Sequence, residues 1–273
     1  MKKDSIVTML KGLWIGGTMT VPGVSGGSMA MILGIYDRLI SAVNNAIKFK
    51  KESILFLIQF LIGAVVGLVL FSKAVPYLLT QFPFPMHFFF IGCVAGGIPM
   101  IFRAAKVTKF SWKIVVYLLF GILLVTLIAM IPKGLFVSKG GFLGILLQLI
   151  GGILIAIALV LPGISVSHML YMLGLYETVT TAVGNLDILS VLPLGIGVVG
   201  GILLTAKVME KAMNRAPQFT YLVVLGFLLG SLPELFPMGI SVNLLTIIIS
   251  LIMAVAGFFF IYLITKKEEL ISE

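Results

Sequence analysis

The stretch PGVSGGSMAMILGIYDRLISAVNN at residues 22–45 recurs without a gap as PGISVSHMLYMLGLYETVTTAVGN at residues 162–185. Identical residues include the Pro-Gly pair, a serine two positions after it and the tyrosine of a Gly-x-Tyr element. Downstream the match continues with a spacing six residues shorter, at Gly63/Gly197, Lys73/Lys207, Gly92/Gly226 and Pro99/Pro233. Matching prolines, tyrosines and lysines are not expected by chance in apolar sequence, so two homologous halves are predicted, at residues 1–140 and 141–273.

The composition indicates that lipid is the solvent around most of the chain. Of its 273 residues, 60% are hydrophobic and 11% charged, and its mean hydropathy is +1.21. A soluble domain of this size needs far more polar surface, so an all-α polytopic membrane protein is predicted. Apolar runs of roughly 17 to 22 residues are long enough to cross a ~30 Å hydrocarbon core. The predicted plain spans are 53–72, 86–102 and 113–131, then 190–206, 219–233 and 243–264.

Each half begins with a segment that a Pro-Gly pair interrupts, at residues 5–44 and 141–183. In the first segment neither arm is comfortably a full span, so a re-entrant hairpin fits better than two crossings, although full spanning stays open. In either arrangement each half crosses the membrane an odd number of times. The halves are therefore predicted to be inverted-topology repeats, each with a re-entrant hairpin and three transmembrane helices.

The basic residues test this topology independently. With the N-terminus in the cytoplasm, sixteen of the 19 Lys and Arg residues fall inside, and Lys73, Lys133 and Lys139 fall outside. This bias is the one expected of cytoplasmic loops, so both termini are predicted to be cytoplasmic. Because the positive charge lies in short loops between apolar spans, nucleic acid is not an expected partner.

The residues after each Pro-Gly pair, SGGS at 25–28 and SVSH at 165–168, are predicted to form the first turn of a short helix. The first amides of a helix lack intrahelical partners and carry partial positive charge, so they attract anions. Glycine permits close backbone approach, and serine hydroxyls can donate to a phosphate oxygen. The predicted substrate-binding residues are Ser25, Gly26, Gly27, Ser28, Ser165, Ser167, His168 and Arg38.

Plainer interpretations of several residues stay open. Pro-Gly can kink a helix with no ligand present, His168 can be a packed histidine bonded to the backbone, and Arg38 can be a positive-inside anchor. Asp37 and Glu177 are equivalent acids after Gly-x-Tyr. They are either coupling sites for H⁺ or Na⁺ or ordinary acids at the membrane interface.

No catalytic group, metal site or cofactor is predicted. The ten carboxylates lie in loops, at termini or at span edges, and the lone Cys93 excludes an internal disulfide or a multi-cysteine metal site. Clustered His, Asp and Arg residues that could act together as nucleophile, acid and phosphate clamp are absent from the sequence, so an enzyme is not expected. Tyr36 and Tyr176 are expected to be aromatic anchors at the membrane interface.

The motifs PGVSGGSMAMILGIY and LPGISVSHMLYMLGLY, with the Gly-x-x-x-Gly-x-x-Pro elements at 92–99 and 226–233, resemble the PopT family of bacterial polyprenyl-phosphate transporters. The resemblance covers essentially the whole chain. It implies a protein of the bacterial cytoplasmic membrane that returns undecaprenyl phosphate from the outer to the inner leaflet for reuse in cell-envelope synthesis. The first motif is intact. The second departs from the family pattern at Val166 and His168, which makes phosphate contact by the second loop less secure.

The leading hypothesis is alternating access, with the phosphate held between the N-termini of two opposed half-helices while the lipid tail stays in the bilayer. The alternative is a secondary transporter for a small soluble anion that uses the same site.

Overall fold

The computed structural model describes residues 2–21, 23–131, 134, 141–185, 187, 189–236 and 243–272, and these residues form helices and turns without any β-strand. The first half contains α1 (Lys2–Thr18), α2 (Gly26–Ile32), α3 (Tyr36–Ala46), α4 (Lys51–Phe71), α5 (Ala74–Gln81), α6 (Pro83–Ala104) and α7 (Trp112–Ala129). The second half contains α8 (Gly141–Val160), α9 (Val166–Leu173), α10 (Tyr176–Gly184), η1 (Leu189–Val191), α11 (Leu192–Arg215), α12 (Pro217–Ser231), η2 (Leu232–Leu235) and α13 (Leu244–Ser272).

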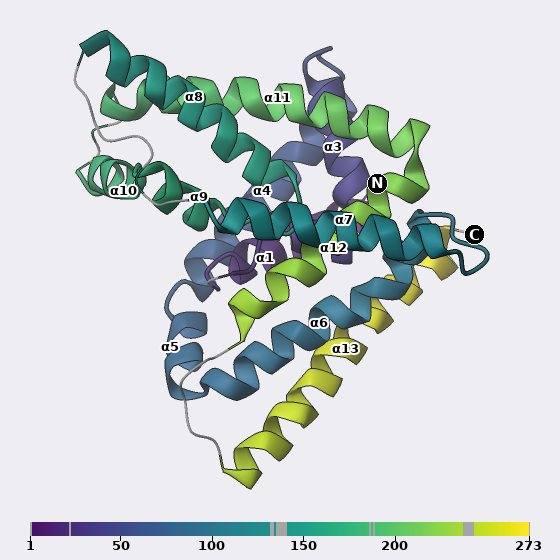
Figure 1. Cartoon of the computed structure of the whole chain (residues 1–273). Helices are drawn as coiled ribbons and strands as arrows, with labels where there is room; N and C mark the ends of the chain where they lie inside the picture. Colours follow the sequence, from purple (N-terminus) through teal and green to yellow (C-terminus); the bar gives the residue numbers. More distant parts are fainter. Residues whose placement is uncertain are drawn as a thin grey trace.

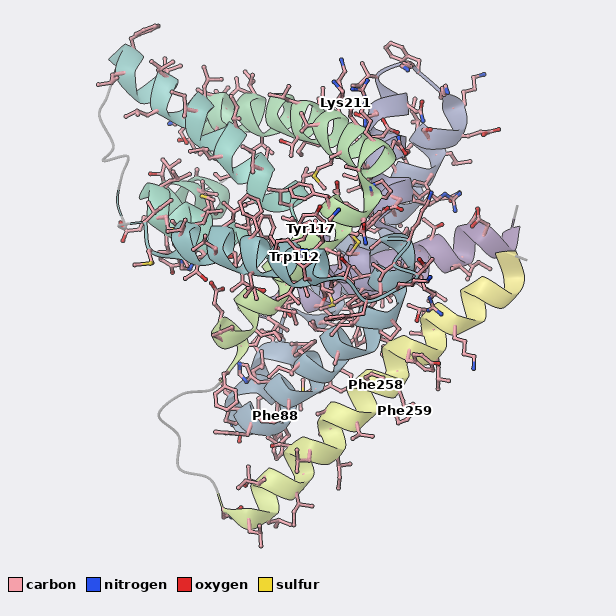
Figure 2. The ribbon with its side chains drawn as sticks, turned by 45° about the vertical axis from the view of Figure 1, so that its right-hand side comes forward. Phe88, Trp112, Tyr117, Lys211, Phe258 and Phe259 are labelled. Carbon is pink, nitrogen blue, oxygen red and sulfur yellow. The ribbon has the colours of Figure 1, made fainter. Side chains whose placement is uncertain are left out.

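Seven of the described helices are long and apolar enough to cross a membrane, which confirms the predicted all-α polytopic membrane protein. Helices α4, α6, α7, α11, α12 and α13 lie over the six plain spans, and α8 is the seventh. Most apolar side chains of α4, α7, α11 and α13 face outward, as expected of helices in lipid, whereas α12 is mostly buried within the molecule. Figure 2 labels one example, Phe259 on α13, whose side chain is 51% exposed.

Four close helix pairs organise the molecule: α1 with α4, α8 with α11, α6 with α13 and α7 with α12. In Figure 1 α8 and α11 run side by side along the top, and α6 and α13 along the bottom. Glycines make this approach possible, because a side chain at Gly67 would collide with the Leu13 carbonyl of α1. The repeat-related Gly92 and Gly226 face Ala254 of α13 and Leu118 of α7, so each half packs its last helix against the other half.

The two interrupted segments have the same local structure. Helices α2 and α9 begin 140 residues apart, as do α3 and α10. The glycines after the break, Gly23 and Gly163, have φ of 81° and 89°, and those that end α2 and α9, Gly34 and Gly174, have φ of 68° and 71°. These left-handed conformations favour glycine, which explains why both glycine pairs recur in the sequence repeat.

Some of the predictions fall on residues outside the described part of the chain. These are the break residue Pro22, the outer lysines Lys133 and Lys139, and the boundary between the halves at residue 140. The inverted orientation of the halves and the re-entrant course of the interrupted segments stay predictions.

Candidate functional site

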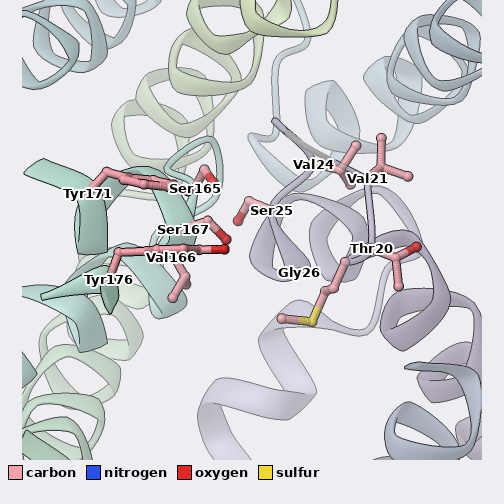
Figure 3. Close-up of a pocket in the computed structure, with 11 residues that line it drawn as sticks. Thr20, Val21, Val24, Ser25, Gly26, Ser165, Val166, Ser167, Tyr171 and Tyr176 are labelled. Carbon is pink, nitrogen blue, oxygen red and sulfur yellow. The ribbon is translucent and has the colours of Figure 1, made fainter. Parts of the chain in front are cut away.

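A cavity of about 300 Å³ lies where the two interrupted segments meet. It is lined by Met19, Thr20, Val21, Val24, Ser25, Gly26, Ser165, Val166, Ser167, Tyr171 and Tyr176. Figure 3 shows residues of the first half on one side and residues of the second half on the other. The first turns of α2 and α9 thus border one space, although they are 140 residues apart in the sequence.

Three serines, Ser25, Ser165 and Ser167, are among the residues that line this cavity. Ser25 precedes α2 in an extended conformation, makes no capping hydrogen bond with its side chain and points across the cavity toward Ser165 and Ser167 (Figure 3). Ser165 precedes α9, and its Oγ accepts a long hydrogen bond of 3.4 Å from the His168 amide. The three hydroxyls can therefore reorient to donate to an anion that enters the cavity.

Four of the eight predicted substrate-binding residues line the cavity: Ser25, Gly26, Ser165 and Ser167. Gly27 and Ser28 lie behind it, where they hold the two interrupted segments together. The Ser28 side chain is buried, and its Oγ accepts a hydrogen bond of 2.8 Å from the Gly163 amide. A side chain at Gly27 would press on the carbonyls of Leu159 and Val160 at the end of α8.

His168 and Arg38 also lie outside the cavity lining. His168 is half-buried on the first turn of α9. Arg38 forms a bidentate ion pair with Asp4, with N–O distances of 2.9 and 3.0 Å, and stacks over Phe56 at 4.3 Å. Its guanidinium donates to the Asp4 carboxylate and thereby holds the pKa of Asp4 below its usual range.

The equivalent acids Asp37 and Glu177 have different surroundings. Asp37 accepts a hydrogen bond from the Tyr221 hydroxyl of α12 and borders a second cavity of about 270 Å³. That cavity also includes Lys106 and Glu210. Glu177 is exposed and borders a third, more open cavity beside α10. Within the described residues no group of His, Cys, Asp and Glu side chains is arranged to hold a metal ion.

The expectation that Tyr36 is an interfacial anchor is wrong, whereas the same expectation for Tyr176 stays a prediction. Tyr36 is only 3% exposed, and its hydroxyl donates to the Val160 carbonyl at 2.8 Å. Tyr176 stacks on Tyr171 with ring centroids 3.9 Å apart, and both rings form a wall of the cavity. Sequence reasoning missed Thr20, Tyr171 and Tyr176 as lining residues. The repeat could have indicated Tyr176, because a tyrosine follows each Pro-Gly pair at the same distance. A tyrosine kept at that place in both halves is expected to contact the interrupted segment.

Comparison with known proteins agrees with the resemblance seen in the motifs. The family described as undecaprenyl phosphate translocase-like matches residues 15–247 of this chain. A polyprenyl-phosphate transporter of Staphylococcus aureus (strain NCTC 8325 / PS 47) is 30% identical over 273 residues, 94% of this chain and 95% of the relative. A polyprenyl-phosphate transporter of Vibrio cholerae serotype O1 (strain ATCC 39315 / El Tor Inaba N16961) is 29% identical over 248 residues, 84% of this chain and 77% of the relative. No solved structure matches. The names of the family and of both relatives describe transport and not an enzymatic reaction.

Proposed function

The chain belongs to the undecaprenyl phosphate translocase-like family, and from this premise we propose that it moves a polyprenyl phosphate from the outer to the inner leaflet of the bacterial cytoplasmic membrane. The observation that carries the proposal is the cavity between the two interrupted segments, with Ser25 on one side and Ser165 and Ser167 on the other. Hydrogen bonds to a charged group contribute more than those between neutral groups, so several hydroxyls around one phosphate give useful affinity.

Only the head group of such a lipid needs a polar path. A long isoprenoid tail is most stable in the hydrocarbon core, whereas a charged phosphate is costly there. A cavity of about 300 Å³ between the broken helices shelters the phosphate from hydrocarbon while the tail remains outside in lipid. The same difference in solvation keeps the free lipid in one leaflet, because its phosphate would otherwise have to cross the hydrocarbon core.

The proposed direction of transport is combined with the proposed orientation of the chain. In this arrangement the halves are inverted repeats with re-entrant hairpins at 5–44 and 141–183, and both termini are cytoplasmic. Glu177 and Asp187 then lie on the outer side, next to the cavity wall that Tyr176 forms. The head group enters from the outer leaflet in this conformation. Asp37 is a better candidate than Glu177 for coupling to H⁺ or Na⁺, because Asp37 of α3 accepts a hydrogen bond from Tyr221 of α12 and so links the two halves.

Leaflet-resolved transport of undecaprenyl phosphate in proteoliposomes tests this function. The double variant Ser25→Ala/Ser165→Ala removes one hydroxyl from each side of the cavity. The matched control is Ser72→Ala, whose exposed hydroxyl donates to the Val69 carbonyl at the end of α4. Loss of two hydrogen bonds to a charged group, each contributing about 1.5–3 kcal/mol, predicts at least a roughly hundredfold weaker interaction with the phosphate.

Two outcomes contradict the proposal. One is absence of lipid movement by folded wild-type protein under every imposed ion gradient. The other is strong competition by soluble phosphate, with no requirement for a polyprenyl tail, which favours the small-anion transporter. If Ser72→Ala lowers transport as much as the double variant does, Ser25 and Ser165 do not bind the phosphate.

A further inference from the structure

The two halves make unequal contacts although their local structures match. The Tyr36 hydroxyl of the first half donates to the Val160 carbonyl at the end of α8. The positions 140 residues away are Tyr176 in the second half and Thr20, just after the end of α1. Tyr176 stacks on Tyr171 instead, and Tyr176 and Thr20 both line the cavity. The cavity thus occupies the place where the second tyrosine contact would form.

The same inequality extends to α3 and α10. Helix α3 is bound to the other half: Ser41 and Asn44 each donate to the Glu210 carboxylate of α11 at 2.8 Å, and Tyr221 of α12 donates to Asp37. Helix α10 packs on α9 and η1, and in Figure 1 it lies at the edge of the molecule, away from the central helices. Its Glu177 and Thr181, the counterparts of Asp37 and Ser41, border an open cavity.

The repeat identifies the missing partner of Glu177. Helices α6 and α12 both begin at a proline, Pro83 and Pro217, and the residues before these prolines have nearly equal conformations, with φ, ψ of −130°, 59° and −139°, 62°. With these helix starts aligned, Tyr221 corresponds to His87. In the present structure His87 Nδ1 lies 2.6 Å from the Pro83 carbonyl, so its Nε2 is the atom able to reach a second partner.

We propose that the protein has a second conformation in which Tyr176 donates to the Thr20 carbonyl and Glu177 pairs with His87, while the Tyr36–Val160 and Asp37–Tyr221 contacts break. Tyr36–Val160 and Asp37–Tyr221 form one set of contacts, and Tyr176–Thr20 and Glu177–His87 form the other. Only one set is made in each conformation. The change from the first set to the second would close the cavity on the side of α10 and open it on the side of α3. This inference rests on the proposed transport function and assigns His87, Tyr36 and Tyr176 as positioning residues for it.

Paired cysteines in a Cys93→Ala background test the two sets. Because these contacts join the tips of long side chains, the cysteines would be too far apart for a direct disulfide, and a short bifunctional methanethiosulfonate is used to cross-link them. Asp37→Cys with Tyr221→Cys is expected to be cross-linked in the present conformation, and His87→Cys with Glu177→Cys in the proposed one. The mismatched pair Asp37→Cys with His87→Cys is the control, because neither conformation brings these positions together. Cross-linking of the His87–Glu177 pair at a rate no greater than that of the mismatched pair would overturn the proposal.

Single substitutions provide a second measurement that does not depend on cross-linking. Ser167 is exposed in the cavity, so the rate at which a membrane-impermeant maleimide labels Ser167→Cys reports how open the cavity is. Loss of one hydrogen bond shifts a two-state ratio by roughly three- to tenfold. Tyr36→Phe is therefore expected to lower the labelling rate, and Tyr176→Phe to raise it or leave it at its maximum.

A lower labelling rate in Tyr176→Phe, or an unchanged rate in Tyr36→Phe, would also overturn the exchange. Neither measurement requires lipid movement. If the His87–Glu177 pair is cross-linked but undecaprenyl phosphate is not transported, the conformational inference stands and the proposed substrate is wrong. If the lipid is transported and this pair is not cross-linked, the substrate stands and the exchange is wrong.

Discussion

Gly23 and Gly163 occupy the same place in the two Pro-Gly motifs, yet the structure predicts very different costs when each is replaced by alanine. Both have φ in the left-handed region, at 81° and 89°. At Gly163 an added Cβ would lie 2.6 to 2.7 Å from the carbonyl carbon, the carbonyl oxygen and the Cβ of Phe227. At Gly23 the nearest atom is the Leu235 Cδ2 at 3.2 Å, at the flexible end of a side chain.

The difference in unfolding free energy follows from these distances. Both variants lose about 1–2 kcal/mol from the left-handed backbone and regain roughly 0.4–1 kcal/mol because alanine restricts the unfolded chain. Gly163→Ala also pushes against backbone atoms of α12, and overpacking of this kind costs about 1–3 kcal/mol. We therefore expect Gly163→Ala to be about 2 kcal/mol less stable than Gly23→Ala.

Thermal unfolding in a single detergent, at one scan rate, measures this difference. For a chain of this size, about 2 kcal/mol corresponds to a Tm difference of roughly 4–8 °C. Wild type and Gly200→Ala serve as controls, because open space surrounds Gly200 within α11. Equal Tm values for Gly23→Ala and Gly163→Ala would show that α12 does not press on the second break as the structure has it.

Three further predictions concern contacts around the site. Ser28→Ala leaves the buried Gly163 amide without its acceptor and is expected to cost about 1–3 kcal/mol, measured as a lower Tm in detergent, whereas an unchanged Tm would mean that water replaces the hydroxyl. Glu210→Ala removes the acceptor of both Ser41 and Asn44, so hydrogen exchange in α3 should become faster while exchange in α10 stays the same. An unchanged α3 would refute the role of Glu210 in docking it. Arg38→Gln should let the pKa of Asp4 rise toward its ordinary value. Because a lowered carboxyl pKa stabilises the folded state only above that pKa, the small loss of stability should be present at neutral pH and disappear as pH falls through it; a loss that persists in acid would assign Arg38 another role.

The helical membrane fold follows from local sequence properties. Apolar runs of membrane length predict helices without knowledge of any partner, because in lipid a backbone must satisfy its own hydrogen bonds. The serines after each break were also predictable from local sequence, because a Pro-Gly pair ends one helix and a serine favours the start of the next. Four residues at the starts of these helices line the cavity: Ser25, Gly26, Ser165 and Ser167.

The roles of Ser28, Tyr36 and Tyr176 were not predictable from local patterns. Ser28 has the same chemistry as Ser25 and lies three residues further along the chain, but it faces the other half of the protein and bonds to Gly163. Tyr36 and Tyr176 match in the repeat, yet one bonds to a carbonyl across the break and the other lines the cavity. A repeat in sequence predicts equal potential contacts. It cannot say which member of each pair makes its contact in a given conformation.

By itself, the sequence determined that the chain is an all-helical membrane protein and predicted two related halves, because helix length, apolar character and self-similarity are properties of the chain alone. Its motifs also determined the family. Only the tertiary structure decided that the two breaks meet around one cavity and that α6 and α7 pair with α13 and α12, respectively. It also decided that α3 is hydrogen-bonded to α11 and α12, whereas α10 packs on α9 and η1. These features depend on contacts between segments that are more than a hundred residues apart in the sequence. The local sequence allows several such arrangements, and close glycine contacts and single hydrogen bonds stabilise one of them.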